Sequence, residues 1–274
     1  MMRIGIIGCG WLGRPLAKRL LERGHEVVGT TTRTEKVNAL REDGIMAHVL
    51  DLNRDVSEDC ARALGDCRRL FVNVPPGRGH ADVETRYPAW MRRLLAVDSP
   101  AVERWVFAST TGVYGAARGP VLETTPPLPE RATGRAVLAA ERLLQAELGE
   151  RCRVARLAGL AGGAREPGRW LAGKIGLPKG DAPVNLIHRA DAVALIVRLV
   201  EADDLAHSHY QLCAAVHPRK RDFYPERAER LGLVPPTFLP GGGLDKRIDA
   251  TRIQHEFDYQ WRYPDPRSFP VEGA

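Results

Sequence analysis

The feature that most constrains this chain is a glycine-rich turn near its N-terminus. The turn, Gly8-Cys9-Gly10-Trp11-Leu12-Gly13, directly follows the apolar run Arg3–Ile7. It opens an amphipathic stretch with leucines at 16, 20 and 21 on one helical face and Gly24 as a C-cap. A short apolar strand, a glycine-rich turn and a helix in this order are typical of a βαβ unit. The sequence therefore predicts that the chain starts with such a unit.

Apolar runs and amphipathic stretches keep alternating over the first 160 residues. The expected strands are Arg3–Ile7, Glu26–Thr31, Ala47–Asp51, Leu70–Val74, Trp105–Ser109 and Arg153–Leu157. The expected helices are Gly13–Arg23, Lys36–Arg41, Val83–Leu95, Arg135–Leu148 and Ala190–Glu201. Six parallel strands with helices on both faces form a doubly wound sheet of the Rossmann type, so we predict an α/β fold.

The alternation weakens after Gly159, where glycine and proline break the chain into short pieces. We therefore expect residues 1–160 to form the Rossmann domain and residues 161–274 to form mostly a smaller substrate cap. The helix near 190–201 and a strand near 210–216 are expected to return to the Rossmann domain.

Composition excludes several classes of protein. The 274 residues are 44% hydrophobic and 27% charged, and no apolar run is long enough for a membrane helix. The net charge is +6, but 34 of the 40 basic residues are arginines scattered among acids, unlike a nucleic-acid patch. The five cysteines show no disulfide or metal-ligand spacing. We expect a soluble cytoplasmic protein, monomeric or homodimeric, with no metal, membrane or nucleic-acid partner.

The glycine-rich turn predicts a dinucleotide site. Gly8 permits the tight turn, Gly10 lets the backbone approach a pyrophosphate, and Gly13 allows close packing of helix and strand. The backbone N–H groups of Trp11 and Leu12 lie at the start of the helix, where its dipole favours an anion. The alternative is that the glycines only shape a strand–helix turn.

The end of the second expected strand indicates which dinucleotide is bound. An NAD site usually has Asp or Glu at this position, whereas this chain has Thr31, Thr32 and Arg33. Hydroxyls and a guanidinium match a 2′-phosphate, so we predict NADP(H), with NAD(H) as the weaker ligand. In the alternative, Arg33 is a solvated charge that starts the next helix.

Further segments resemble the extended and atypical short-chain dehydrogenases/reductases known as NAD(P)-dependent epimerases/dehydratases. They are Asp51-Leu52, Asn73-Val74-Pro75, the SSxxVYG-like run Ser109–Gly115 and the NxIHxxD-like run Asn185–Asp191. Near the C-terminus, Phe223-Tyr224-Pro225 and Tyr263-Pro264-Asp265-Pro266 resemble the bacterial YeeZ-like subgroup.

This resemblance implies roles for several residues. Asp51 and Leu52 would contact the adenine, and Asn73, Val74 and Pro75 would lie beside the nicotinamide ribose. Thr110 falls on the position of the catalytic Ser or Thr.

The chain departs from the family at its YxxxK motif, where it has Thr133 and Val137. Neither side chain transfers a proton near neutral pH, and Arg135 points about 200° away from residue 133 along a helix. Tyr114 is then the best remaining acid/base candidate, beside Thr110. The alternatives are that Thr110 caps its strand and that Tyr114 packs beneath the cap.

The sequence thus predicts an NADP(H)-binding short-chain dehydrogenase/reductase. It would act as an oxidoreductase or epimerase/dehydratase on a small hydroxyl- or carbonyl-bearing substrate, with sugar-like or phosphorylated compounds included. The alternative is a non-catalytic NADP(H)-binding regulatory or interaction protein that has lost YxxxK. Substrate and reaction direction stay open at this stage.

Overall fold

The computed structural model describes residues 1–77 and 79–271 and divides into two compact units. Unit 1 comprises Met1–Val113, Pro129–Ala155 and Ile196–His209. Unit 2 comprises Tyr114–Leu128, Arg156–Leu195 and the segment from Tyr210 to the C-terminus. The predicted boundary near residue 160 stays a prediction.

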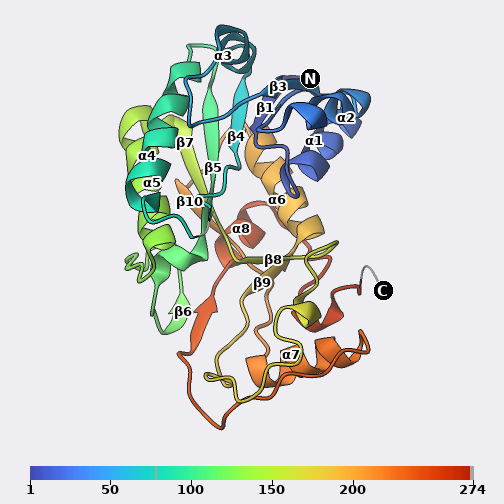
Figure 1. Ribbon diagram of the computed structural model, residues 1–274. Coiled ribbons are helices and arrows are strands. Elements are labelled where there is room, and N and C mark those ends of the chain that lie inside the picture. Colours follow the sequence, from blue (N-terminus) through green and yellow to red (C-terminus); the bar gives the residue numbers. More distant parts are fainter. Residues whose placement is uncertain (78, 272–274) are drawn as a thin grey trace. The chain divides into compact units, whose positions relative to one another are not determined.

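The largest sheet has seven strands in the order β10-β7-β5-β4-β1-β2-β3 (Figure 1). Its strands are β1 Arg3–Ile7, β2 Glu26–Thr31, β3 Met46–Val49, β4 Arg69–Val72, β5 Arg104–Thr110, β7 Cys152–Leu157 and β10 His209–Leu212. In the central register, Ile4 of β1 pairs in parallel with Val27 of β2 and with Arg69 of β4. The predicted doubly wound α/β fold is confirmed, with β10 as a seventh strand.

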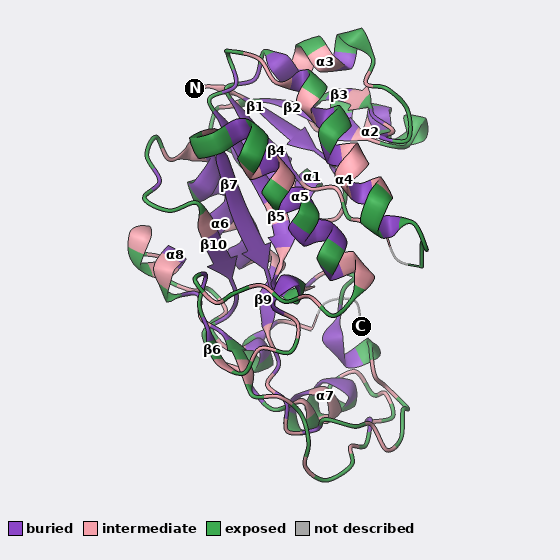
Figure 2. Ribbon diagram, turned by 90° about the vertical axis from the view of Figure 1, so that its left-hand side faces the viewer, coloured by how far each residue is buried: buried purple, intermediate pink, exposed green. Residues whose placement is uncertain are grey.

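The inner strands are buried on both faces (Figure 2). Ile4, Ile6 and Ile7 of β1 have no exposed surface, and all four residues of β4 are buried. Parallel sheets covered on both faces have such continuous apolar runs, which explains why these strands could be predicted from the sequence.

Helices cover both faces of the sheet in unit 1. Helices α1 and α2 lie on one side, and α4 and α5 pack against each other on the other side (Figure 1). Helix α6 begins in unit 2 and ends in unit 1. The bounds of these helices are α1 Gly13–Glu22, α2 Val37–Glu42, α4 Val83–Leu94, α5 Ala132–Leu148 and α6 Arg189–Glu201.

Helix α3, Glu58–Gly65, was not predicted from the sequence. Its N-cap is Ser57, whose Oγ accepts a hydrogen bond from the backbone N–H of Cys60, and Glu58 and Asp59 occupy its first turn. These are ordinary helix-start signals, but the helix has only eight residues and its apolar pattern is correspondingly short.

Unit 2 consists mainly of short elements. They are β6 Gly119–Val121 paired with β11 Lys246–Ile248, β8 Gly159–Ala161 paired with β9 Leu186–His188, and helices α7 Lys220–Glu229 and α8 Thr251–Glu256. Short 3₁₀ turns across the chain lie at Thr34–Lys36, Leu95–Val97, Thr111–Tyr114, Gly149–Arg151, Pro167–Arg169 and Pro266–Ser268. Across the described residues, no helix combines the length and apolarity needed to span a bilayer.

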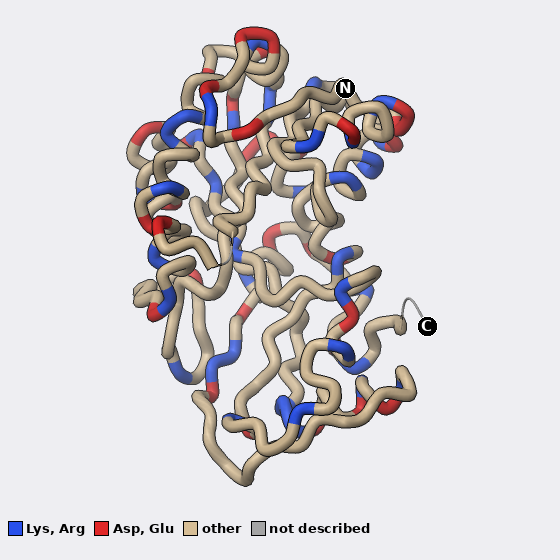
Figure 3. The backbone as a smooth tube through the Cα atoms, in the orientation of Figure 1, with Lys and Arg blue, Asp and Glu red and all other residues tan. Residues whose placement is uncertain are grey.

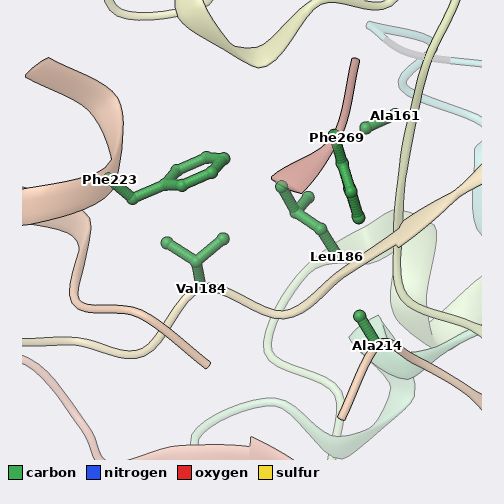
Figure 4. Close-up of a cluster of buried hydrophobic side chains, with 6 residues drawn as sticks. All are labelled: Ala161, Val184, Leu186, Ala214, Phe223 and Phe269. Carbon is green, nitrogen blue, oxygen red and sulfur yellow. The ribbon is translucent and has the colours of Figure 1, made fainter. Parts of the chain in front are cut away.

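An apolar cluster links the short elements of unit 2 (Figure 4). Phe223 comes from α7 and Phe269 from a segment near the C-terminus. The whole cluster is Ala161, Val184, Leu186, Ala214, Phe223 and Phe269. Because these residues come from distant parts of the sequence, no local pattern of apolar residues predicts this core.

Two buried ionic groups add to this core. The Arg227 guanidinium forms two hydrogen bonds with the Glu166 carboxylate, at 3.0 and 2.6 Å, and donates a third to the carbonyl of Phe269 at 2.6 Å. The Asp191 carboxylate accepts from the Tyr259 hydroxyl and from the backbone N–H groups of Arg262 and Tyr263. Asp191 therefore fixes the segment that follows α8.

Candidate functional site

Two glycines of the N-terminal turn are required by packing. Gly8 has φ +105°, and a Cβ there would lie 2.6 Å from the carbonyl oxygen of Asn73. A Cβ on Gly13 would lie 2.2 Å from the carbonyl oxygen of Gly8. Side chains at these positions would separate β1 from the residues after β4, or α1 from the turn. The turn also depends on Thr30, whose Oγ1 accepts from the N–H of Gly8 and which the sequence analysis did not single out.

Gly10 differs from the other two glycines because it faces open space. A Cβ built on it would have no protein atom within 4 Å apart from those of its two chain neighbours, and the residue is exposed. Next to it, α1 begins with no side-chain cap and no acidic residue in its first turn. Uncapped N–H groups at a positive helix end form an anion site, and a side chain at Gly10 would occupy the space beside it.

The remaining turn residues, Cys9, Trp11 and Leu12, differ in their burial and contacts. Leu12 is buried as the N-cap of α1, and Trp11 is half-buried. Cys9 is buried, its thiol lies 3.7 Å from the carbonyl of Ile6, and burial raises its pKa to about 12. Cys9 is therefore a packing residue and not a thiolate at neutral pH.

The end of β2 carries hydroxyls and a cation. Thr31 is half-buried, and its Oγ1 accepts from the N–H of Arg33 at 3.3 Å. Thr32 and Arg33 are exposed, and Arg33 forms no ion pair within residues 1–77 and 79–271. Its guanidinium thus keeps its donors available for an external anion.

Asp51 and Leu52 follow β3 and lie near α4. The Asp51 carboxylate accepts from the backbone N–H and side-chain amide of Asn53, which fixes a turn. The carbonyl of Leu52 accepts from Arg93 on α4 at 2.7 Å, and the Asn53 amide oxygen accepts from Trp90 Nε1 at 3.2 Å. Helix α4 therefore holds this turn in place.

The residues after β4 pack on the glycine-rich turn. The Asn73 side-chain amide donates to the carbonyl of Gly8 at 3.2 Å, and the carbonyl of Val74 accepts from the buried Tyr87 hydroxyl at 2.7 Å. Pro75 is exposed. Asn73 and Gly8 thus join two of the segments predicted to bind the cofactor.

Thr110 ends β5 with a half-buried side chain whose Oγ1 accepts from the N–H of Gly112 at 3.1 Å. Its neighbour Ser109 is buried and donates to the Glu141 carboxylate of α5. A Cβ at Gly134 of α5 would lie 3.2 Å from the carbonyl of Gly112, so this glycine allows α5 to approach the Thr110 segment closely. No pattern in the sequence marked Gly134 for this contact.

Tyr114 is buried in unit 2, with 1% of its surface exposed. Arg156 Nη1 donates to its hydroxyl oxygen at 2.8 Å, and the Arg156 guanidinium lies 5.0 Å from the centre of its ring. Arg156 is itself buried at the end of β7, and the sequence analysis did not identify it. Because β7 carries two buried arginines, Arg153 and Arg156, its sequence does not distinguish Arg156 for this contact.

The structure places both substituted YxxxK positions on α5. Val137 is 4% exposed and belongs to the core of unit 1, whereas Thr133 is half-buried in the first turn. Arg135 forms a bidentate ion pair with Glu84 of α4 at 2.8 and 2.7 Å. This ion pair is consistent with the prediction that Arg135 takes no part in proton transfer.

Charged residues of both signs are distributed along the chain. Figure 3 shows Lys and Arg interleaved with Asp and Glu through unit 1. Within the part of the chain that the structure describes, no cluster of three or more His, Cys, Asp or Glu side chains could hold a metal ion.

Comparisons with known proteins identify the family. Residues 4–213 match the NAD dependent epimerase/dehydratase family. Protein YeeZ of Escherichia coli (strain K12) is 37% identical over 276 residues, covering 99% of this chain and 100% of that protein.

Two solved structures share the fold. A functionally unknown conserved protein from Silicibacter pomeroyi DSS is 25% identical with a TM-score of 0.78, over 97% of this chain and 96% of that one. UDP-glucuronic acid 4-epimerase from Bacillus cereus, in complex with NAD, is 18% identical with a TM-score of 0.79, over 96% and 94% of the two chains. The doubly wound sheet, the glycine-rich turn and these matches agree, and the chain belongs to the NAD dependent epimerase/dehydratase family.

Proposed function

We propose that the chain binds NADP(H) at the glycine-rich turn of unit 1. The pyrophosphate would lie over Gly10 and the N–H groups of Trp11 and Leu12 at the start of α1. The adenosine would contact Asp51 and Leu52, and the nicotinamide ribose would lie beside Asn73, Val74 and Pro75. The open space at Gly10, next to a helix end without cap or acid, is the observation that carries this proposal.

The test is Gly10→Val. The variant should fold, because a Cβ at this position would meet no protein atom within 4 Å apart from those of its two chain neighbours. It should lose NADPH binding by calorimetry, because the side chain would occupy the space of the pyrophosphate. Gly13→Val is the matched contrast, since its Cβ would lie 2.2 Å from a backbone oxygen and should impair folding itself. A folded Gly10→Val protein with unchanged NADPH affinity would refute the site.

The preference for the 2′-phosphate rests on the end of β2. Thr31 and Thr32 offer hydroxyls, Arg33 has no internal ion pair within the described residues, and no carboxylate stands where NAD sites hold one. A guanidinium binds phosphate through paired, charge-assisted hydrogen bonds. These features support NADP(H) over NAD(H).

For the chemistry, we propose an oxidoreductase or epimerase/dehydratase acting on a small hydroxyl- or carbonyl-bearing substrate. The nicotinamide, when bound, supplies hydride transfer. The Thr110 hydroxyl would donate to the substrate oxygen, since its own Oγ1 already accepts from Gly112. Val137 is hydrocarbon in the core and Thr133 does not ionise near neutral pH, so the proton must move by another group. We assign that role to Tyr114, whose oxygen is held by Arg156.

One structural neighbour supports a proposal about the substrate class. One structural neighbour is a UDP-sugar epimerase in complex with NAD, and we propose a sugar-like or phosphorylated substrate for this chain. Mass spectrometry of molecules that copurify with the protein, followed by an NADPH-linked screen of carbonyl compounds and nucleotide sugars, tests this directly. NADPH binding without any turnover would favour a regulatory role and reject the enzyme.

A further inference from the structure

A cavity lies within unit 2, and none of its lining residues belongs to the proposed cofactor site. It has a volume of about 270 Å³ and is lined by residues of β6, the segment after β10, the β11–α8 segment and Trp261. Liquid water occupies about 30 Å³ per molecule, so the cavity has room for a small organic ligand. Its side chains determine which ligand would fit.

Two opposite charges line this cavity. Arg247 and Asp249 flank Ile248, and two residues along an extended chain are about 6.6 Å apart. Arg247 Nη2 lies 3.1 Å from the Asp245 carboxylate, and a guanidinium has five N–H donors, so donors remain for a ligand. Asp249 Oδ1 accepts from the N–H and hydroxyl of Thr251. Its Oδ2 has no hydrogen-bond donor within the described residues.

Two uncharged polar side chains, those of His217 and Gln254, also belong to residues that line the cavity. His217 Nδ1 lies 3.4 Å from the carbonyl of Val184 and donates to it, which makes Nε2 an acceptor. Burial lowers the pKa of His217, and the charge of Arg247 lowers it further, so the ring is neutral at pH 7. The Gln254 amide oxygen accepts from Trp261 Nε1 at 3.0 Å, which leaves the amide NH₂ group as a donor.

Most of the other residues that line the cavity are apolar. Trp261, Pro120 and Ile248 are among these residues. An apolar or aromatic ligand group would pack against them. The cavity therefore offers acceptors at Asp249 and His217, donors at Arg247 and Gln254, and an apolar wall.

We propose that this cavity binds a zwitterionic α-amino acid with an apolar side chain. The carboxylate would lie at Arg247 and Gln254, the ammonium at Asp249 and His217, and the side chain against Trp261. In an α-amino acid the nitrogen and the carboxylate carbon are about 2.5 Å apart. Two charge-assisted hydrogen bonds of about 2.8 Å extend this span to about 8 Å, within reach of the flexible Arg247 side chain.

The test is calorimetric titration of the full chain with four related probes: L-phenylalanine, L-leucine, phenethylamine and 3-phenylpropionate. We expect L-phenylalanine to bind with a Kd on the order of 1 mM, which is within the affinity that a ligand with so few non-hydrogen atoms can reach. Phenethylamine lacks the carboxylate and 3-phenylpropionate lacks the ammonium, so each should bind at least about tenfold more weakly. Equal binding of either analogue, or no binding of L-phenylalanine or L-leucine, would overturn the proposal.

Variants locate the binding in this cavity. Arg247→Met and Asp249→Asn should each weaken L-phenylalanine by about ten- to a hundredfold. The amide introduced by Asp249→Asn keeps an oxygen that can hold Thr251, so this change removes the charge and preserves the turn. Lys246→Met is the control, because Lys246 donates to the carbonyl of Gly115 and does not line the cavity. A loss with Lys246→Met as large as that with Arg247→Met would reject this location, as would unchanged affinity in Arg247→Met.

Discussion

At the scale of single residues, the glycine-rich turn has two different requirements. Gly8 and Gly13 have no Cβ because backbone oxygens of the protein occupy that space. Gly10 has none although the space around it is empty. Packing explains the first two residues, and it leaves the third to be explained by a ligand.

Arg33 yields a prediction about cofactor choice. Losing a charge-assisted phosphate contact costs about 1.5–3 kcal/mol, so Arg33→Ala should weaken NADPH about ten- to a hundredfold and affect NADH little. Lys36→Ala is the control, because Lys36 is another exposed cation near the same strand end. Calorimetry with both nucleotides measures this. Equal affinity of the parent protein for NADPH and NADH would contradict the assignment.

Tyr114 yields a prediction about proton transfer. Tyr114→Phe keeps the ring over Arg156 and removes the hydroxyl that accepts its hydrogen bond. General acid–base catalysis contributes about 10²–10⁴-fold, so most of the activity found in a substrate screen should be lost. NADPH affinity should hold, which separates this effect from misfolding. A Tyr114→Phe protein as active as its parent would assign the residue to packing.

At the scale of elements, the pattern of apolar residues predicted the helices and strands whose burial is regular. The central strands are apolar on both faces, and α1, α4 and α5 were predicted within a few residues of their bounds. Helix α7 was missed because Pro225 lies inside it and few of its residues are buried. In the site, the glycine spacing identified the turn, whereas Thr30, Gly134 and Arg156 act through contacts with distant segments. Such contacts leave no local pattern.

The first turn of α6 yields a stability prediction. Asp191→Ala removes the acceptor of three hydrogen bonds and leaves the backbone N–H groups of Arg262 and Tyr263 without their partner. We expect a loss of about 3 kcal/mol in the free energy of unfolding, measured with urea. Asp191→Asn keeps one oxygen acceptor and should lose less. A change below about 0.5 kcal/mol in Asp191→Ala would show that this anchor is dispensable.

At the scale of the whole molecule, ion pairs determine the response to acid. Arg14 and Lys18 lower the pKa of Asp43 to about 2, and Arg69 and Arg68 lower that of Glu103. Burial opposes ionisation of Asp98, but Arg151 and Trp105 outweigh it and lower its pKa. The folded chain therefore binds fewer protons than the unfolded chain in this range, and low pH favours unfolding.

The urea midpoint should consequently fall as the pH drops from about 5 toward 2, through the range between the unfolded and folded pKa values. Asp43→Asn should flatten this fall, because the substituted amide does not titrate. The midpoint is followed by circular dichroism at fixed ionic strength. A midpoint that rises toward pH 3 would contradict the sign of these pKa shifts.

The contacts of Arg227 bear on how the chain folds as it is synthesised. The guanidinium has no exposed surface, and two of its acceptors are the carbonyls of Phe269 and Pro270, more than forty residues downstream. Until that segment leaves the ribosome, the Arg227 guanidinium lacks two of its hydrogen-bond acceptors. Burying a cation without its partners costs free energy. Unit 1 contains nothing beyond His209 and can assemble earlier. Nascent chains stalled before residue 269 should therefore expose unit 2 to proteases while unit 1 is already protected.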